Sequence, residues 1–130
     1  MKAEEDMKKL EEALKGSLSG LYKTASNRSM AYTKLTLAEK ELERLFPVFD
    51  KYSLVRHLDL NTNTIPDLAP ISVLEHLQWL NASKNQISSL ELFQKDTFEH
   101  LQMLNLSGNK IKALTKIGLP ALRRLNLSEN

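Results

Sequence analysis

The stretch Leu104-Asn105-Leu106-Ser107-Gly108-Asn109-Lys110-Ile111 decides the fold of this 130-residue chain, because its pattern returns at regular intervals. The pattern is Leu-x-Leu-x-x-Asn-x-Ile, and the other copies in the same register begin at Leu35, Leu58, Leu80 and Leu125. The copy at residue 35 is degenerate, with Lys40 in the Asn position, and the last copy is incomplete at Asn130. Successive copies are 23, 22, 24 and 21 residues apart, a spacing typical of a structural repeat.

Each Leu-x-Leu predicts a short strand, because alternation with period two turns both leucines to one face of a sheet. A single repeat cannot bury its leucines alone, so neighbouring repeats must stack with their strands parallel. Repeats of about 22 residues leave little room for long helices between strands. The sequence therefore predicts an α/β leucine-rich repeat solenoid, with a curved parallel sheet inside and short turns or 3₁₀ helices on the convex side.

The repeated asparagine has a structural explanation. It follows the strand where the chain turns inward and backbone groups would otherwise be buried without partners. A side-chain amide can supply those hydrogen bonds from one coil to the next. We therefore expect a structural ladder made of Asn63, Asn85, Asn109 and Asn130.

The two ends of the chain differ from the repeats. Residues 4–23 carry apolar side chains at three- and four-residue steps, a pattern that predicts an amphipathic helix weakened by Gly16 and Gly20. Such a helix would cover the first coil, and residues 24–29 would be a connecting loop. We therefore divide the chain into an N-terminal helical cap and loop (1–30) and the repeats (31–130). The incomplete last repeat leads us to expect a fragment of a longer solenoid.

Composition excludes several classes of function. The 18 Lys and Arg against 16 Asp and Glu give a net charge of +2, which disfavours a strongly basic nucleic-acid binder. The absence of cysteine removes disulfides, thiolate nucleophiles and Cys-built zinc sites. Neither a signal peptide nor an apolar stretch of the roughly 20 residues needed for a membrane span is evident. We expect a cytoplasmic protein.

The residues give no indication of an enzyme. His76 and His100 occupy equivalent repeat positions, each just before a leucine, so we interpret them as repeat residues rather than a metal pair. His57 and Asp59 would lie on the same face of one strand with no nucleophile nearby. No glycine-rich phosphate loop is present. We expect no catalytic residues, no metal, no cofactor and no small-molecule substrate.

The inner face of the sheet is the expected place for function. Its outward strand positions form columns, in which Trp79, the single tryptophan, would lie next to Met103 within a polar surround. Tryptophan and arginine are the types most enriched in interface hot spots. The alternative is that neighbouring side chains merely cover Trp79. The partner-binding residues that we predict are His57, Asp59, Trp79, Asn81, Met103, Asn105 and Arg124.

More specific segments surround the repeats, including Leu21-Tyr22-Lys23-Thr24, Ala31-Tyr32-Thr33-Lys34-Leu35 and Leu77-Gln78-Trp79-Leu80. Over roughly residues 17–130 the chain resembles the N-terminal portion of the leucine-rich repeat-containing protein 23 family of ciliary radial spoke proteins. The resemblance implies a structural scaffold in the axoneme of a motile cilium or flagellum, within the third radial spoke head. It implies contacts with other radial spoke or axonemal proteins and no catalytic residues.

A second hypothesis keeps the fold and changes the function. Short repeats of this kind also resemble a regulatory subunit of a protein phosphatase, and a spliceosomal scaffold protein that helps to hold an RNA-binding partner. The balanced charge and the lack of a basic stripe argue against direct contact with nucleic acid. Comparing salt-extracted axonemes with nuclear extract would separate the two hypotheses.

Overall fold

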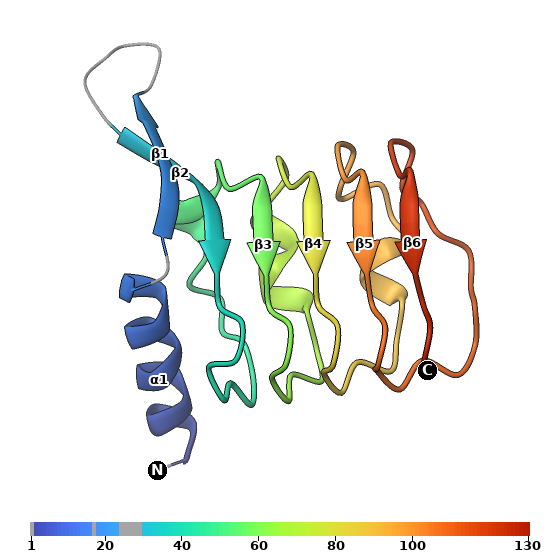
Figure 1. The fold of residues 1–130 in the computed structure, drawn as a ribbon, viewed down its shortest axis with the longest axis horizontal. Coiled ribbons are helices and arrows are strands. Elements are labelled where there is room, and N and C mark those ends of the chain that lie inside the picture. The colour runs from blue at the N-terminus through green and yellow to red at the C-terminus, as the bar shows by residue number, and fades with distance from the viewer. Residues whose placement is uncertain (1, 17, 24–29) are drawn as a thin grey trace.

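The computed structural model describes residues 2–16, 18–23 and 30–130 and shows one open sheet of six strands (Figure 1). The strands follow one another in sequence order across the sheet. Their bounds are β1 Leu18–Lys23, β2 Met30–Thr36, β3 His57–Asp59, β4 Trp79–Asn81, β5 Met103–Asn105 and β6 Arg124–Asn126. Strands β2 to β6 are parallel, as expected for stacked repeats.

The register of the parallel strands follows the repeat. The first leucines of successive repeats are paired directly across the sheet, in the order Leu35, Leu58, Leu80, Leu104 and Leu125. The first four are fully buried, and together with the second leucines and the isoleucines they form one continuous core. The predicted leucine-rich repeat architecture is thereby confirmed.

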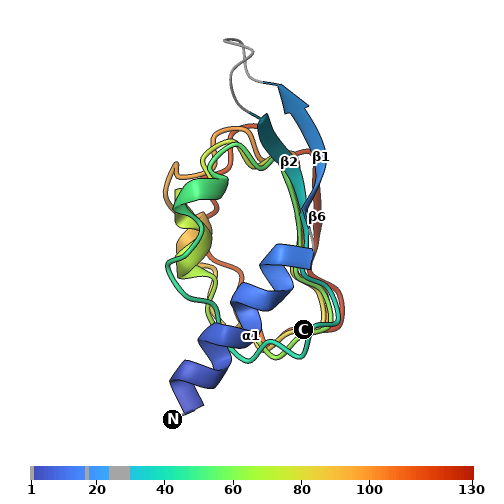
Figure 2. The ribbon, with the colours of Figure 1, turned by 90° about the vertical axis from the view of Figure 1, so that its left-hand side faces the viewer.

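Short 3₁₀ helices occupy the side opposite the sheet (Figure 2). They are η1 Asp50–Tyr52, η2 Ala69–Val73 and η3 Glu91–Phe93. Each spans at most five residues, because a repeat of about 22 residues has little chain left for the return path. Fully buried Ile71 and Phe93 point from η2 and η3 into the core.

The N-terminal segment corrects one prediction. Helix α1 spans Lys2–Gly16 rather than residues 4–23, and residues 18–23 form strand β1, antiparallel to β2. Pairing with β2 adds a sixth strand to the sheet, and this long-range hydrogen bonding outweighs the local helical spacing of the apolar residues. The expected loop at residues 24–29 lies outside the described residues. The domain boundary at residue 30 stays a prediction.

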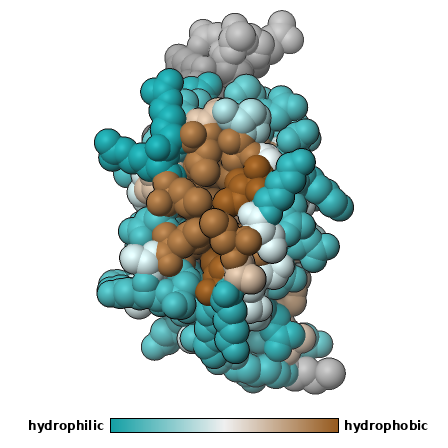
Figure 3. Space-filling model, turned by 90° about the vertical axis from the view of Figure 1, so that its right-hand side faces the viewer, coloured by the Kyte–Doolittle hydropathy of each residue, from teal (hydrophilic) through white to brown (hydrophobic). Residues whose placement is uncertain are grey.

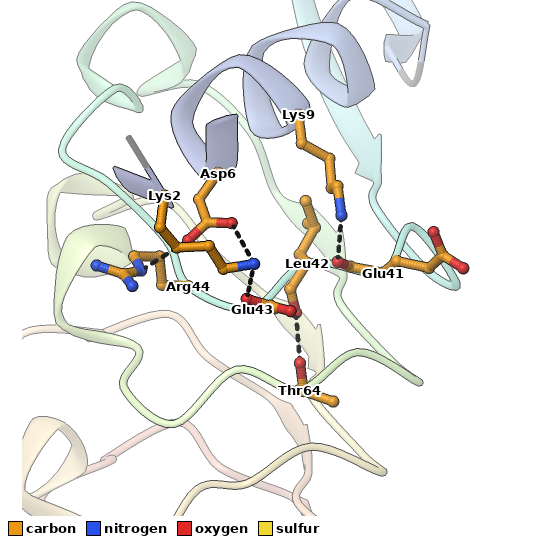
Figure 4. Close-up of polar contacts among 8 residues, drawn as sticks. All are labelled: Lys2, Asp6, Lys9, Glu41, Leu42, Glu43, Arg44 and Thr64. Carbon is orange, nitrogen blue, oxygen red and sulfur yellow. Dashed lines mark hydrogen bonds and ion pairs between the residues drawn. The ribbon is translucent and has the colours of Figure 1, made fainter. Parts of the chain in front are cut away.

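Helix α1 lies across the N-terminal end of the stacked coils, with Leu10 and Leu14 buried in the core (Figure 2). Its first turns are fixed to the first repeat by charges (Figure 4). Asp6 is only 4% exposed, and its carboxylate lies 3.1 Å from Nε of Arg44 and 3.5 Å from Nζ of Lys2. The Arg44 contact is an ion pair rather than a hydrogen bond, since Oδ2 of Asp6 has no hydrogen-bond donor among the described residues.

Lys2 makes the shortest contact of this group, because its Nζ also lies 2.7 Å from Oε2 of Glu43 (Figure 4). This hydrogen bond raises the pKa of the Lys2 ammonium, although partial desolvation opposes the change. On the next turn of the helix, Nζ of Lys9 donates to the backbone carbonyl of Glu41 at 3.3 Å. The charged side of α1 is therefore anchored while its apolar side covers the first coil.

The opposite end of the stack presents apolar side chains to solvent (Figure 3). In the last coil, Leu114 is 70% exposed and Leu125 is 39% exposed, whereas Leu104, the equivalent of Leu125 one repeat earlier, is fully buried. Strand β6 is hydrogen-bonded to β5 on one side and has no neighbour on its other side among the described strands.

Candidate functional site

The solvent face of the sheet, opposite the buried leucines, carries two rows of side chains from the parallel strands. The first row, one residue per strand, is Lys34, His57, Trp79, Met103 and Arg124. The second row, two residues further along each strand, is Thr36, Asp59, Asn81, Asn105 and Asn126. Adjacent strands lie about 4.8 Å apart, so each row forms a continuous line of side chains across the sheet. All seven residues predicted to bind a partner lie in these two rows.

The middle of the first row is aromatic and apolar. The rings of His57 and Trp79 are tilted by 34° with centroids 6.1 Å apart. Trp79 and Met103 pair across β4 and β5, and both are half-buried on the face that points away from the core. Arg124 continues the row and is exposed. The tryptophan is thus supported by a neighbouring ring while much of its surface stays accessible.

The second row is organised by hydrogen bonds to the backbone. Oδ1 of Asn81 accepts from the N–H of Ser83, two residues later, at 3.0 Å. The same bond occurs at Asn105 and Asn126, each at 3.0 Å. Asp59 has the equivalent role in its repeat, and its Oδ1 accepts from both the backbone and the side-chain amide of Asn61. These bonds fix the orientation of the side chains in the second row.

The ladder asparagines lie at the ends of the strands and face the core rather than the partner side. Asn85 is buried, and its Oδ1 accepts from the N–H of Ile65 in the preceding repeat at 3.0 Å. Its Nδ2 donates to the carbonyls of Leu60 in that repeat (2.9 Å) and Ala82 in its own (3.1 Å). Equivalent bonds between repeats are made by Asn63, Asn109 and Asn130. These amides therefore connect each coil to the one before it.

The two equivalent histidines lie away from the sheet face. His76 and His100 stack with centroids 6.3 Å apart and an angle of 10° between the rings, beside a hollow of about 310 Å³. Glu75, Asp96 and Glu99 line the same hollow. Within the described residues, no group of three or more His, Cys, Asp or Glu side chains is arranged to hold a metal ion.

Sequence reasoning missed two exposed cations beside the first row. Arg56 immediately precedes His57, and Arg123 immediately precedes Arg124. Their backbone N–H groups donate to Thr33 and Gln102 in the adjacent repeats, which places both arginines at the edge of the sheet. The signal was present in the sequence as two positive residues at equivalent repeat positions. The alternation within the strands does not reveal it, because Arg56 and Arg123 precede β3 and β6.

The fold, the repeat register and the ladder together define a leucine-rich repeat solenoid. A family model described as leucine rich repeat matches residues 75–130. No helix in the part of the chain that the structure describes has both the length and the apolar character needed to cross a bilayer.

The chain is similar to leucine-rich repeat-containing protein 23 of Homo sapiens, with 34% identity over 82 residues. It is also similar to the protein of the same name in Bos taurus, again with 34% identity over 82 residues. The matched region is 63% of this chain and 24% of each relative, so the chain spans about a quarter of their length. These matches confirm the resemblance found in the sequence.

Proposed function

We propose that this chain is a protein–protein interaction scaffold that binds its partner through the two rows on the solvent face of the sheet. The observation that carries the proposal is the row itself: parallel pairing brings His57, Trp79, Met103 and Arg124 side by side from four repeats. An apolar centre within a polar rim is the usual anatomy of a protein interface. Extended binding surfaces of this kind are also how stacked repeats are generally used.

We further propose that the scaffold belongs to the axoneme of a motile cilium or flagellum, as a component of the third radial spoke head. The similarity to leucine-rich repeat-containing protein 23 supports this assignment. The partners would then be other radial spoke or axonemal proteins. In this role the chain requires no catalytic residue, cofactor, membrane or nucleic acid.

Fractionation of ciliated cells tests the cellular assignment. The tagged chain should remain with salt-washed axonemes, at a level comparable to known spoke proteins. Recovery in nuclear extract with ribonucleoproteins, or in a phosphatase complex, would contradict the ciliary proposal and favour the alternative role of a regulatory or scaffold subunit. A variant with a disrupted core, Leu104→Ala, shows how much retention comes from misfolding and aggregation alone.

A further inference from the structure

We propose that the solvent face of the sheet recognises an acidic segment of its partner protein, a segment that also carries one apolar side chain. This inference rests on the proposed function, because it specifies the partner of the same face. It follows from the balance between hydrogen-bond donors and acceptors on that face, which the structure shows and the composition does not.

The face carries more positive than negative charge. Lys34 and Arg124 lie at the two ends of the first row, and Arg56 and Arg123 lie at its edge; all four are exposed. The ion pairs found among the described residues all lie at helix α1, and none of them includes these four cations. Four guanidinium and ammonium groups are therefore available to a ligand, while the chain as a whole has a net charge of only +2.

The second row adds uncharged hydrogen-bond donors to these cations. In a side-chain amide only the oxygen accepts hydrogen bonds, so the backbone N–H groups that donate to Asn81, Asn105 and Asn126 bond to Oδ1 in each case. The oxygen of each amide is thus used within the repeat. The Nδ2 groups of these three asparagines make no hydrogen bond with any described residue. They are left to donate to a ligand.

The two rows hold a single carboxylate, that of Asp59, and its Oδ1 is used within the repeat. Asp59 accepts from the backbone N–H of Asn61 at 3.0 Å and from its side-chain Nδ2 at 2.7 Å. A surface with four free cations and three free amide donors against one carboxylate complements carboxylate and carbonyl oxygens. Trp79 and Met103, between the cations, require an apolar side chain in the ligand.

These features favour an acidic protein segment over single-stranded nucleic acid. Proteins that bind single strands stack successive bases on a series of aromatic rings, whereas the two rows hold only the rings of His57 and Trp79. The five parallel strands span about 19 Å at about 4.8 Å per step, which about six residues of extended peptide would cover. An acidic peptide of that length matches both the span and the chemistry.

Selection from a random dodecapeptide display library on the immobilised 130-residue chain tests the inference. We expect enriched peptides to have a net negative charge around one aromatic or aliphatic residue. Binding of a selected peptide should weaken about tenfold or more in Arg124→Glu and should weaken further with added salt. The matched control is Lys112→Glu, which reverses an exposed charge beside Leu90 and Gln94, away from the sheet face, and should change binding little.

Three results would overturn the inference, and the effect of Trp79→Ala on peptide binding separates its failure from failure of the proposed function. If enriched peptides bind through Trp79 but are neutral or basic, the face binds protein and the acidic specificity is wrong. The acidic specificity is also wrong if an oligouridylate probe binds the face more tightly than the selected peptides. If no enriched peptide depends on Trp79, the proposed function fails together with the inference.

Discussion

The backbone N–H of Ile65 donates a hydrogen bond to the side-chain oxygen of Asn85, which lies one repeat later in the chain, at 3.0 Å. Asn85 is only 3% exposed, so this bond and the bonds from its amide nitrogen replace the water that the turning backbone has lost. The ladder therefore satisfies buried backbone groups at the point where each strand ends.

Replacing Asn85 by alanine should destabilise the fold by about 1–3 kcal/mol, because buried backbone donors and acceptors would lose their partners. Chemical denaturation of the full chain measures the loss. Asn126→Ala is the matched control, since Asn126 is exposed and its side chain bonds only to Ser128 among the described residues. The control should lose no more than about 0.5 kcal/mol. Equal losses in both variants would show that the ladder has no special role.

Truncation of a core leucine tests the repeat register. Leu104 is fully buried in β5, so Leu104→Ala should cost about 2–5 kcal/mol through lost burial and the cavity left behind. Leu114 is 70% exposed, and Leu114→Ala should have little effect on the free energy of unfolding. A loss below about 0.5 kcal/mol at Leu104 would place that leucine outside the core.

The repeats were predictable from sequence because each position has one strong local requirement. The alternation at Leu104 and Leu106 fixes which face is buried, and the spacing of the repeats fixes which strands are neighbours. Strand β1 was not predictable in the same way. Leu18 and Leu21 also fit a helical spacing, and the strand depends on pairing with β2, which lies beyond residues 24–29 in the sequence.

The position of the two rows was predictable from the sequence, but the excess of hydrogen-bond donors in them was not. The columns containing Trp79 and Asn81 follow directly from the repeat register. The donor character of the second row depends on which amide atom bonds the backbone, and hydrogen-bond geometry alone reveals this. The ion pairs that hold α1 also depend on tertiary structure, since Asp6 and Arg44 are 38 positions apart.

The last coil should be the least stable part of this 130-residue chain. The amide of Leu106 donates to Asn126 of the exposed strand β6, whereas the amide of Leu60 donates to Asn81 of β4 within the sheet. Hydrogen exchange should therefore be faster at Leu106 than at Leu60, because fewer contacts hold β6. Equal protection at both amides, with Leu125 also protected in a monomer, would contradict this expectation.

The hydrogen bond between Lys2 and Glu43 should be detectable by titration. The bond raises the pKa of Lys2 above its ordinary value of 10.5. The stabilisation that it gives the folded state is therefore present below pH 10.5 and is lost as the pH rises through the raised pKa. Glu43→Gln should lower the pKa of Lys2, measured by NMR at its Cε. Glu41→Gln, which removes an exposed carboxylate that does not contact Lys2, should leave that pKa unchanged.

The most direct test of the central claim pairs thermal melting of Trp79→Ala with its incorporation into axonemes. We expect nearly unchanged melting, because the Trp79 side chain points away from the leucine core. Contact with the partner should weaken by about 2 kcal/mol or more, roughly thirtyfold. Val73→Ala, which truncates an exposed apolar side chain in η2, should change neither property. Collapse of the fold in Trp79→Ala, or undiminished incorporation of the folded variant, would contradict the claim that Trp79 binds the partner.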